Sequence, residues 1–212
     1  MTEPSKSPQP GELWSLSVKD FVAATAGKTP IPGGGSVAGV VGGLATALAE
    51  MCVVFTRGKK QFAEHEAELA SLAGQLERAR AMYEALTSDD ASAYTLYQEA
   101  NRCTDETKAQ QQAVALAAAI DVPRQMTALT MRLMDDLAAI STKCNQYLLS
   151  DLAAAAALAE AVVKLCDYNV RTNARFMPDA AAAGELKQAS ARDCARAAAL
   201  RQQVEDVVGK LM

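Results

Sequence analysis

Apolar residues recur at helical spacing along most of the chain, with polar residues in the positions between them. Over 59–86 the apolar side chains fall three or four residues apart, opposite a face of Glu, Gln and Arg. This period is typical of an amphipathic helix. It continues over 104–140, with a kink or break expected at Pro123, which lacks the N–H that a helix interior uses. It returns over 150–175 and 179–211.

Two further helix starts follow from capping patterns. Ser17-Val-Lys-Asp20 has the form of a capping box and predicts a short helix to about Thr25. Residues 87–88 could cap a new segment and so end the preceding helix. Because no stretch shows strand periodicity, the pattern predicts an all-α protein, an elongated antiparallel helical bundle.

The segment 37–56 is the most apolar of the expected helices and differs from the others. It is apolar on nearly every face, so we expect a central helix buried all round. Gly39, Gly42 and Gly43 weaken a helix, and close approach by a neighbouring helix would explain them. A membrane span is the weaker interpretation, because Glu50 would cost about 2.5–3.5 kcal/mol near a bilayer centre. One subunit alone could leave this helix partly uncovered, so a dimer is expected.

Composition narrows the class of protein further. We expect a disordered tail over 1–12, which is polar and proline-rich, and a single domain over 13–212. Alanine dominates the apolar half and aromatics make up 5% of the chain, as suits closely packed helices. A net charge of −4 gives no electrostatic basis for nucleic-acid binding. Five dispersed cysteines and one histidine predict reduced thiols in a cytoplasmic protein and no metal site.

The stretch Pro32-Gly33-Gly34-Gly35-Ser36 stands immediately before the central helix. Three glycines permit dihedral angles closed to other residues and allow another group to come close. With Ser36 as N-cap, the free N–H groups of the helix would suit an anion or a polarised carbonyl. A tight turn at the start of the helix, without a ligand, explains the same residues.

Other polar residues each carry two interpretations. Asp90 and Asp151 could be acids that interact favourably with a helix N-terminus, or functional carboxylates. Lys59 and Lys60 would oppose the dipole at a helix start, which points to a nearby anion, and Lys143 is a second candidate. The amides at positions 169 and 173 share one helical face and could bind a ligand or tie helices together.

Four ordered segments carry a resemblance that spans roughly 16–208. The chain resembles the formiminotetrahydrofolate cyclodeaminase and methenyltetrahydrofolate cyclohydrolase family in Thr29-Pro-Ile-Pro-Gly-Gly-Gly-Ser-Val-Ala38, Gly58-Lys-Lys-Gln-Phe62, Asp89-Asp-Ala-Ser-Ala-Tyr94, and Lys143-Cys-Asn145 followed by Ser150-Asp151. Departures from the family pattern, which put the substrate preference in doubt, are Cys144 where Gly is common, Leu152-Ala153 where Ala-Gly is common, and Arg102-Cys103 where Leu-Pro is common.

The resemblance implies an enzyme of tetrahydrofolate one-carbon metabolism. The cyclodeaminase converts 5-formiminotetrahydrofolate to 5,10-methenyltetrahydrofolate and ammonia, and this reaction is the one we favour. The cyclohydrolase, which adds water to the methenyl compound to give 10-formyltetrahydrofolate, is the alternative. A helical dimer that binds folate or a partner protein without turnover is the alternative of another class. The implied partners are a tetrahydrofolate substrate and a second subunit, with no further cofactor, metal, membrane or nucleic acid.

The resemblance also implies roles for particular residues. Asp90 matches the proton donor, and it must be desolvated or lie beside a carboxylate such as Asp89 to hold a proton at neutral pH. The residues implied to bind substrate are Pro32, Gly33, Gly34, Gly35, Ser36, Lys59, Lys60, Tyr94, Lys143, Asn145, Asp151, Asn169 and Asn173.

Overall fold

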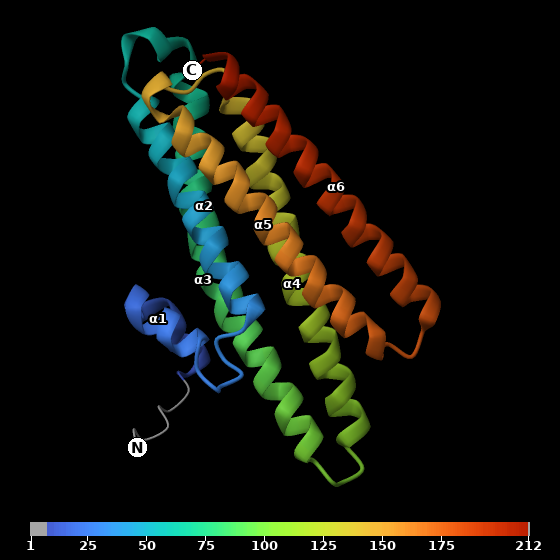
Figure 1. The fold of residues 1–212 in the computed structure, drawn as a ribbon. Coiled ribbons are helices and arrows are strands. Elements are labelled where there is room, and N and C mark those ends of the chain that lie inside the picture. The colour runs from blue at the N-terminus through green and yellow to red at the C-terminus, as the bar shows by residue number, and fades with distance from the viewer. Residues whose placement is uncertain (1–7, 212) are drawn as a thin grey trace.

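The computed structural model describes residues 8–211 as a long bundle of helices, drawn in Figure 1. The α-helices are α1 (Val18–Thr25), α2 (Gly34–Thr56), α3 (Glu66–Arg102), α4 (Lys108–Ile140), α5 (Leu149–Asn173) and α6 (Ala180–Leu211). Short 3-10 helices are η1 (Pro10–Ser15), η2 (Lys60–His65), η3 (Gln146–Leu148) and η4 (Ala174–Phe176). No strand occurs between residues 8 and 211, so the all-α prediction is confirmed.

The long helices run alternately up and down the bundle. Helix α2 packs against α3 and α5, α4 packs against α3 and α5, and α6 lies along α5 and α4 (Figure 1). Small side chains permit this close packing: Ala155, Ala156 and Ala159 of α5 are completely buried. Of the predicted tail, residues 1–7 lie outside the described part of the chain. Residues 10–12 begin η1, which Leu13 anchors by its burial.

The break predicted at residues 87–88 does not occur, because α3 runs through it without interruption. The Thr87 hydroxyl donates to the carbonyl of Tyr83 at 2.6 Å, and the Ser88 hydroxyl donates to that of Glu84 at 3.3 Å. Hydroxyls that bond four residues back are accommodated inside a helix instead of capping a new one. The prediction was wrong because Thr and Ser can either cap the start of a helix or lie inside one with their hydroxyls bonded to the backbone.

Pro123 does not end α4 either, although proline removes one helical hydrogen bond. The carbonyl left without its N–H partner is that of Ala119, four residues earlier. Asn173 of α5 donates its side-chain Nδ2 to this oxygen at 2.9 Å. The helix therefore continues because a side chain from its neighbour replaces the missing donor.

Helix α2 begins at Gly34 with Gly33 as its N-cap, three residues before the predicted start, so Ser36 lies inside the first turn. Gly39 and Gly42 allow the close approach of a neighbouring helix, as predicted: a Cβ at Gly39 would lie 2.1 Å from the Thr87 hydroxyl of α3, and one at Gly42 would lie 2.2 Å from the ring of Tyr83. Gly43 instead faces η1, where a Cβ would lie 2.5 Å from the ring of Trp14.

Within one chain α2 is not buried on all sides, which the sequence prediction allowed for by expecting a second subunit. Leu44, Val54 and Phe55 are each more than half exposed. The helix is apolar and long enough to cross a membrane by length and composition, and half of its most apolar window is buried within the bundle.

Candidate active site

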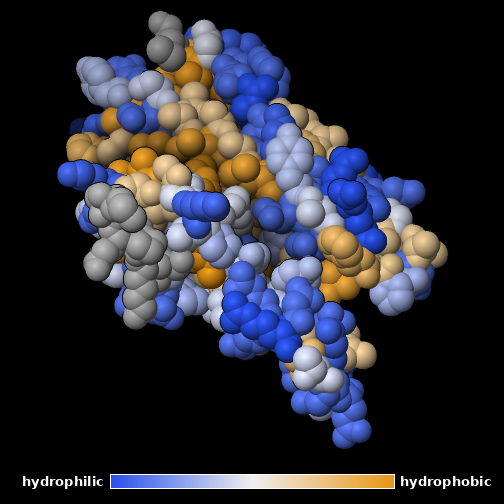
Figure 2. Space-filling view, turned by 60° about the horizontal axis from the view of Figure 1, so that its bottom comes forward, coloured by the Kyte–Doolittle hydropathy of each residue, from blue (hydrophilic) through white to orange (hydrophobic). Residues whose placement is uncertain are grey.

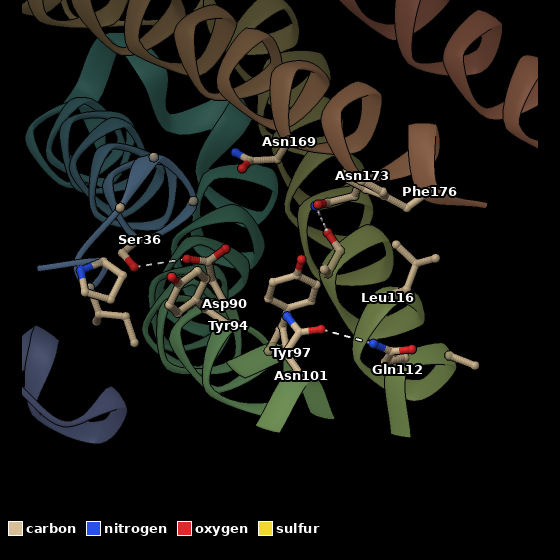
Figure 3. A pocket seen from close by; sticks show the side chains of 18 of the residues that line it. Ser36, Asp90, Tyr94, Tyr97, Asn101, Gln112, Leu116, Asn169, Asn173 and Phe176 are labelled. Carbon is tan, nitrogen blue, oxygen red and sulfur yellow. Dashed lines mark hydrogen bonds between the residues drawn. The ribbon is translucent and has the colours of Figure 1, made fainter. Parts of the chain in front are cut away.

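A cavity of about 730 Å³ opens at the end of the bundle where α2 begins. Figure 2 brings the lower end of Figure 1 forward and shows apolar residues gathered in one broad area, bordered by hydrophilic ones. The cavity is lined by the first turn of α2, the second half of α3, the first half of α4 and the end of α5 with η4 (Figure 3). Its volume is in the range of sites for drug-sized ligands.

The first turn of α2 lies directly against Asp90 of α3. A Cβ at Gly35 would lie only 1.9 Å from the Asp90 Oδ1 atom, so this contact requires glycine. The Ser36 hydroxyl donates to Asp90 Oδ2 at 3.0 Å (Figure 3). The glycine run thus brings the N-terminus of a helix against a carboxyl group that lines the cavity.

Burial controls the protonation of Asp90. Desolvation raises the pKa of this carboxyl above its ordinary value, while hydrogen bonds from the hydroxyl and backbone N–H of Ser36 oppose the shift. Asp89 is exposed on another side of the helix and is not among the causes of the raised pKa of Asp90. Of the two explanations offered for a protonated Asp90, the structure therefore supports desolvation. Within the described lining, Asp90 is the sole carboxyl group and no side chain is basic.

Helix α3 presents a polar and aromatic stripe to the cavity. Asp90, Tyr94, Tyr97 and Asn101 follow at intervals of four, three and four residues, which places them on one helical face. The rings of Tyr94 and Tyr97 lie with their centroids 6.5 Å apart and are tilted by 40° to one another, so a flat ligand could stack on either ring.

The sequence prediction included Tyr94 but missed several lining residues. The interval of Tyr97 and Asn101 from Asp90 was the available signal for those two. Gln112, whose Nε2 donates to Asn101 Oδ1 at 3.1 Å, and Phe176 come from other elements and left no signal in the sequence.

The two predicted amides of α5 both line the cavity, and both use Nδ2 on backbone carbonyls. Asn169 donates to Leu165 within its own helix at 3.0 Å, and Asn173 donates to Ala119 at 2.9 Å. These bonds fix the orientation of the amides, and their carbonyl oxygens remain available as acceptors.

Five other predicted site residues lie at the opposite end of the bundle. Lys59 and Lys60 follow the C-terminal end of α2, whose 23 residues span about 34 Å. Lys143 Nζ forms an ion pair with Glu68 at 2.8 Å. Asn145 donates its backbone N–H to the Thr56 hydroxyl at 3.0 Å.

Asp151 also lies at that end, in the first turn of α5. Within one chain these five residues therefore do not join the cavity. Pro32 is buried in the turn before α2, next to the lining residues Ile31 and Gly33. Among the described residues, no group of three His, Cys, Asp or Glu side chains is placed to hold a metal.

Comparisons with known proteins identify the family. Residues 17–192 match the model of the formiminotransferase-cyclodeaminase family. The chain is 30% identical over 198 residues to methenyltetrahydrofolate cyclohydrolase of Methylorubrum extorquens, covering 91% of this chain and 95% of that protein. It is 30% identical over 173 residues to mouse formimidoyltransferase-cyclodeaminase, covering 79% of this chain and 32% of the mouse protein.

A solved structure gives the same result for the fold. The crystal structure of formiminotetrahydrofolate cyclodeaminase from Thermotoga maritima superposes with a TM-score of 0.86 at 29% identity, covering 94% of this chain and 98% of that one. With the family match covering most of the sequence, the chain belongs to the formiminotransferase-cyclodeaminase family of enzymes.

Proposed function

We propose that this enzyme is a cyclodeaminase that converts 5-formiminotetrahydrofolate to 5,10-methenyltetrahydrofolate and ammonia. The observation that carries the proposal is Asp90, a desolvated carboxyl with a raised pKa, set in a cavity walled by aromatic rings and amides. The rings of Tyr94 and Tyr97 would stack on the substrate, and the amides of Asn169 and Asn173 would orient it. The proposed chemistry requires no metal or further cofactor, and the free cysteines suit a reducing cytoplasm.

The cyclodeaminase reaction needs one proton donor beside the nitrogen that leaves as ammonia. Attack of N10 on the formimino carbon, with transfer of the N10 proton to the imino nitrogen, gives a neutral tetrahedral intermediate with an NH2 group. Protonated Asp90 would donate its proton to this nitrogen, the C–N bond would break, and ammonia would leave. The carboxylate that remains would then stabilise the methenyl cation by opposite charge.

The cyclohydrolase reaction is the second candidate, because the Methylorubrum relative that bears this name matches this chain over nearly its whole length. In that reaction ionised Asp90 would take a proton from the attacking water. It would then donate this proton to N5 as the C–N5 bond breaks, and the hydroxyl group of the intermediate would lose its proton to solvent, which leaves the formyl group on N10. In both reactions one carboxyl group donates a proton to the nitrogen that leaves the tetrahedral carbon, so the same cavity could serve either.

Absorbance spectroscopy with purified protein distinguishes the two reactions. We expect the methenyl absorption band to grow when 5-formiminotetrahydrofolate is added. Decay of the band from added 5,10-methenyltetrahydrofolate, faster than in buffer, would instead identify the cyclohydrolase. If neither substrate changes in the presence of the protein, the enzymatic proposal fails and the non-catalytic folate-binding alternative takes its place.

Asp90→Asn tests the residue itself. We expect kcat to fall about 10²- to 10⁴-fold with little change in substrate binding, because the amide keeps the shape but cannot supply the proton. Asp89→Asn is the matched control, since this neighbouring carboxyl is exposed and outside the cavity. Equal losses in both variants would show that Asp90 is not the acid.

We also propose a homodimer whose subunits pack along their α2 helices. The exposed apolar face of α2 includes Leu44, Val54 and Phe55, which lie in the middle and at the C-terminal end of the helix. Burial of such a face between two copies is favourable at about 25 cal/mol per Å². In an antiparallel pair, Lys59 and Lys60 of the partner subunit would come to the start of α2, beside the cavity.

Two measurements test the dimer. Light scattering should give twice the 22.3 kDa of one chain, and Leu44→Arg should reduce this mass to one chain. Mixing inactive Asp90→Asn subunits with inactive Lys59→Gln/Lys60→Gln subunits should restore part of the activity, since a mixed dimer contains one intact site. A monomeric wild-type protein, or no recovery on mixing, would contradict the shared site.

A further inference from the structure

Two neighbouring helices, α3 and α4, present matching stripes of residues to the cavity. The α3 stripe ends at Asn101, as described above. The α4 stripe consists of residues four and three positions apart, which share one helical face: Gln112, Leu116 and Ala119. Because the two helices are antiparallel neighbours, Asn101 comes level with Gln112 (Figure 3). One turn farther along the bundle, Tyr97 comes level with Leu116, so the stripes form the two walls of one slot.

A hydrogen bond between two amides joins these walls at one end of the slot. Gln112 Nε2 donates to Asn101 Oδ1 at 3.1 Å (Figure 3). Among the described residues, neither side chain makes another hydrogen bond, so both N–H groups of Asn101 and one of Gln112 stay free to donate. Since the described lining has no basic side chain, these N–H groups are the side-chain donors that this end of the cavity offers to an anion.

The distance from Asp90 to the amide pair fits one half of a tetrahydrofolate. Positions 90 and 101 are separated by a rise of about 16 Å along α3. In tetrahydrofolate, N10 carries an aminobenzoyl group, which an amide bond joins to a glutamate. By standard bond lengths, the carbon between N5 and N10 lies roughly 10 Å from the α-carboxylate of this glutamate. With a hydrogen bond of about 3 Å at each end, the substrate would span the interval.

The middle of the slot suits the group that lies between these two ends of the substrate. Tyr97 supplies an aromatic ring from α3, and Ala113 and Leu116 supply aliphatic surface from α4. A flat benzoyl ring packs well against such surfaces. The lining therefore runs from a carboxyl group through apolar side chains to amides, in the same order as the reacting carbon, the benzoyl ring and the glutamate of the substrate.

We propose that Asn101 and Gln112 determine the specificity of the enzyme for the glutamate-bearing half of its substrate. Their free N–H groups bind the α-carboxylate of the glutamate, while Tyr97 and Leu116 hold the benzoyl ring. The proposal rests on the proposed function, because it takes the ligand of the cavity to be a tetrahydrofolate. The two amides position the substrate and take no part in the proton transfers at Asp90.

The first test compares the tetrahydrofolate substrate with the corresponding tetrahydropteroate, which lacks the glutamate. Asn101→Asp/Gln112→Glu keeps the size of both side chains but sets two negative charges against the carboxylate. KM for the glutamate-bearing substrate should rise about 10- to 100-fold, because bonds to a charged group are lost, and KM for the pteroate should change by less than about 2-fold. An equal change for the two substrates would overturn the proposal.

Gln110→Glu/Gln111→Glu is the matched control for this variant. It adds the same charge at two neighbouring exposed positions that do not line the cavity. Both KM values should stay near those of the wild type. A rise in this control as large as that in Asn101→Asp/Gln112→Glu would show that net charge, and not contact with the amide pair, controls the affinity.

The second test needs no catalysis. The fragment p-aminobenzoylglutamate should bind the wild-type protein in ligand-observed NMR, more tightly than p-aminobenzoate, and this advantage should disappear in Asn101→Asp/Gln112→Glu. If the fragment behaves in this way but neither folate reaction occurs, the glutamate site stands and the proposed function fails. Turnover with fragment binding that is the same in the wild type and the variant would overturn the role of the two amides alone.

Discussion

The two ends of α2 both bury polar groups, but they use them differently. At the C-terminal end, the Thr56 hydroxyl donates to the carbonyl of Cys52 at 2.6 Å and accepts the N–H of Asn145 at 3.0 Å. Asn145 also donates its Nδ2 to the carbonyl of Phe55 at 3.3 Å. At the N-terminal end, the carboxyl of Asp90 and the amide oxygens of Asn169 and Asn173 border an open cavity.

This difference separates polar groups that hold the fold together from polar groups that are free to bind a ligand or to react with it. At the C-terminal end, backbone groups use both the Nδ2 donor and the Oδ1 acceptor of Asn145, so this amide holds segments together and leaves nothing for a ligand. The amides of Asn169 and Asn173 use only their Nδ2 donors, and their oxygens remain available. Asp90 is desolvated, and only the hydrogen bonds of Ser36 oppose the rise of its pKa. The buried polar groups of one chain therefore predict opposite responses to mutation at the two ends of α2: activity should fail on mutation of those at the N-terminal end, and stability on mutation of those at the C-terminal end.

The largest expected effect is that of Gly35→Ala at the cavity end. Because the new Cβ would lie 1.9 Å from Asp90 Oδ1, the carboxyl must move and its bond with Ser36 must break. We expect kcat/KM to fall by at least about 100-fold, since displacement of a reacting group by about 1 Å has an effect of this order. Steady-state kinetics would measure the loss.

Gly184→Ala is the control for this variant, because nothing lies within 4 Å of a Cβ at that position of α6. It should retain full activity and should gain slightly in stability, as alanine favours a helix interior by about 0.5–1 kcal/mol over glycine. Full activity of Gly35→Ala would show that the contact with Asp90 is not needed for catalysis.

At the far end, Thr56→Val should lower the free energy of unfolding by about 1–3 kcal/mol, because it leaves the buried N–H of Asn145 without an acceptor. The activity at saturating substrate should stay near that of the wild type. Thr46→Val is the matched control, since the buried Thr46 hydroxyl only donates to the carbonyl of Gly42, within α2. Urea denaturation of the three proteins measures the difference, and equal losses would contradict the assigned role of Thr56.

The helices were largely predictable from the sequence, because apolar periodicity and capping residues act locally. Ser17 caps α1 as predicted, accepting the N–H of Asp20. The predicted break at residues 87–88 failed for a local reason, whereas the continuity of α4 through Pro123 depends on a distant residue. Pro123 stays inside α4 because Asn173, fifty residues later, supplies a donor, and neither residue reveals the other in a single sequence.

The candidate site was predictable only in part, for a related reason. The glycine run, Asp90 and Tyr94 come together because α2 and α3 are neighbouring antiparallel helices. Matching sequence motifs does not show how far apart two motifs lie along the bundle. Lys143 and Asn145 were therefore grouped with the glycine run and Asp90, which lie at the other end. Phe176 escaped prediction because its place depends on how η4 turns across the cavity.

The bond between Asn173 and Ala119 allows a smaller test at the cavity end. Asn173→Ala should cost about 1 kcal/mol of stability, less than Thr56→Val, because water in the cavity can reach the freed carbonyl. In a Pro123→Ala background, the restored N–H would bond Ala119, so the cost of Asn173→Ala should nearly vanish. A double-mutant cycle in urea measures this coupling, and additive effects would contradict the link between the two residues.

The smallest expected effect is the pH dependence of stability that Asp90 contributes. Burial raises the pKa of this carboxyl in the folded protein, whereas in the unfolded chain it should titrate near about 3.9. The folded state therefore holds the proton more tightly. The resulting stabilisation is complete below the unfolded pKa and is lost as the pH rises through the folded pKa.

In Asp90→Asn this position no longer titrates. The unfolding free energy of the wild type minus that of Asp90→Asn should therefore decrease as the pH rises above about 4, and it should level off once the folded carboxyl is ionised. Urea denaturation at a series of pH values measures this difference, and the same difference for Thr56→Val, which removes no titrating group, should not change with pH. An increase with pH would mean that Ser36 and the N-terminus of α2 outweigh burial, so that Asp90 is held as a carboxylate and acts first as a base.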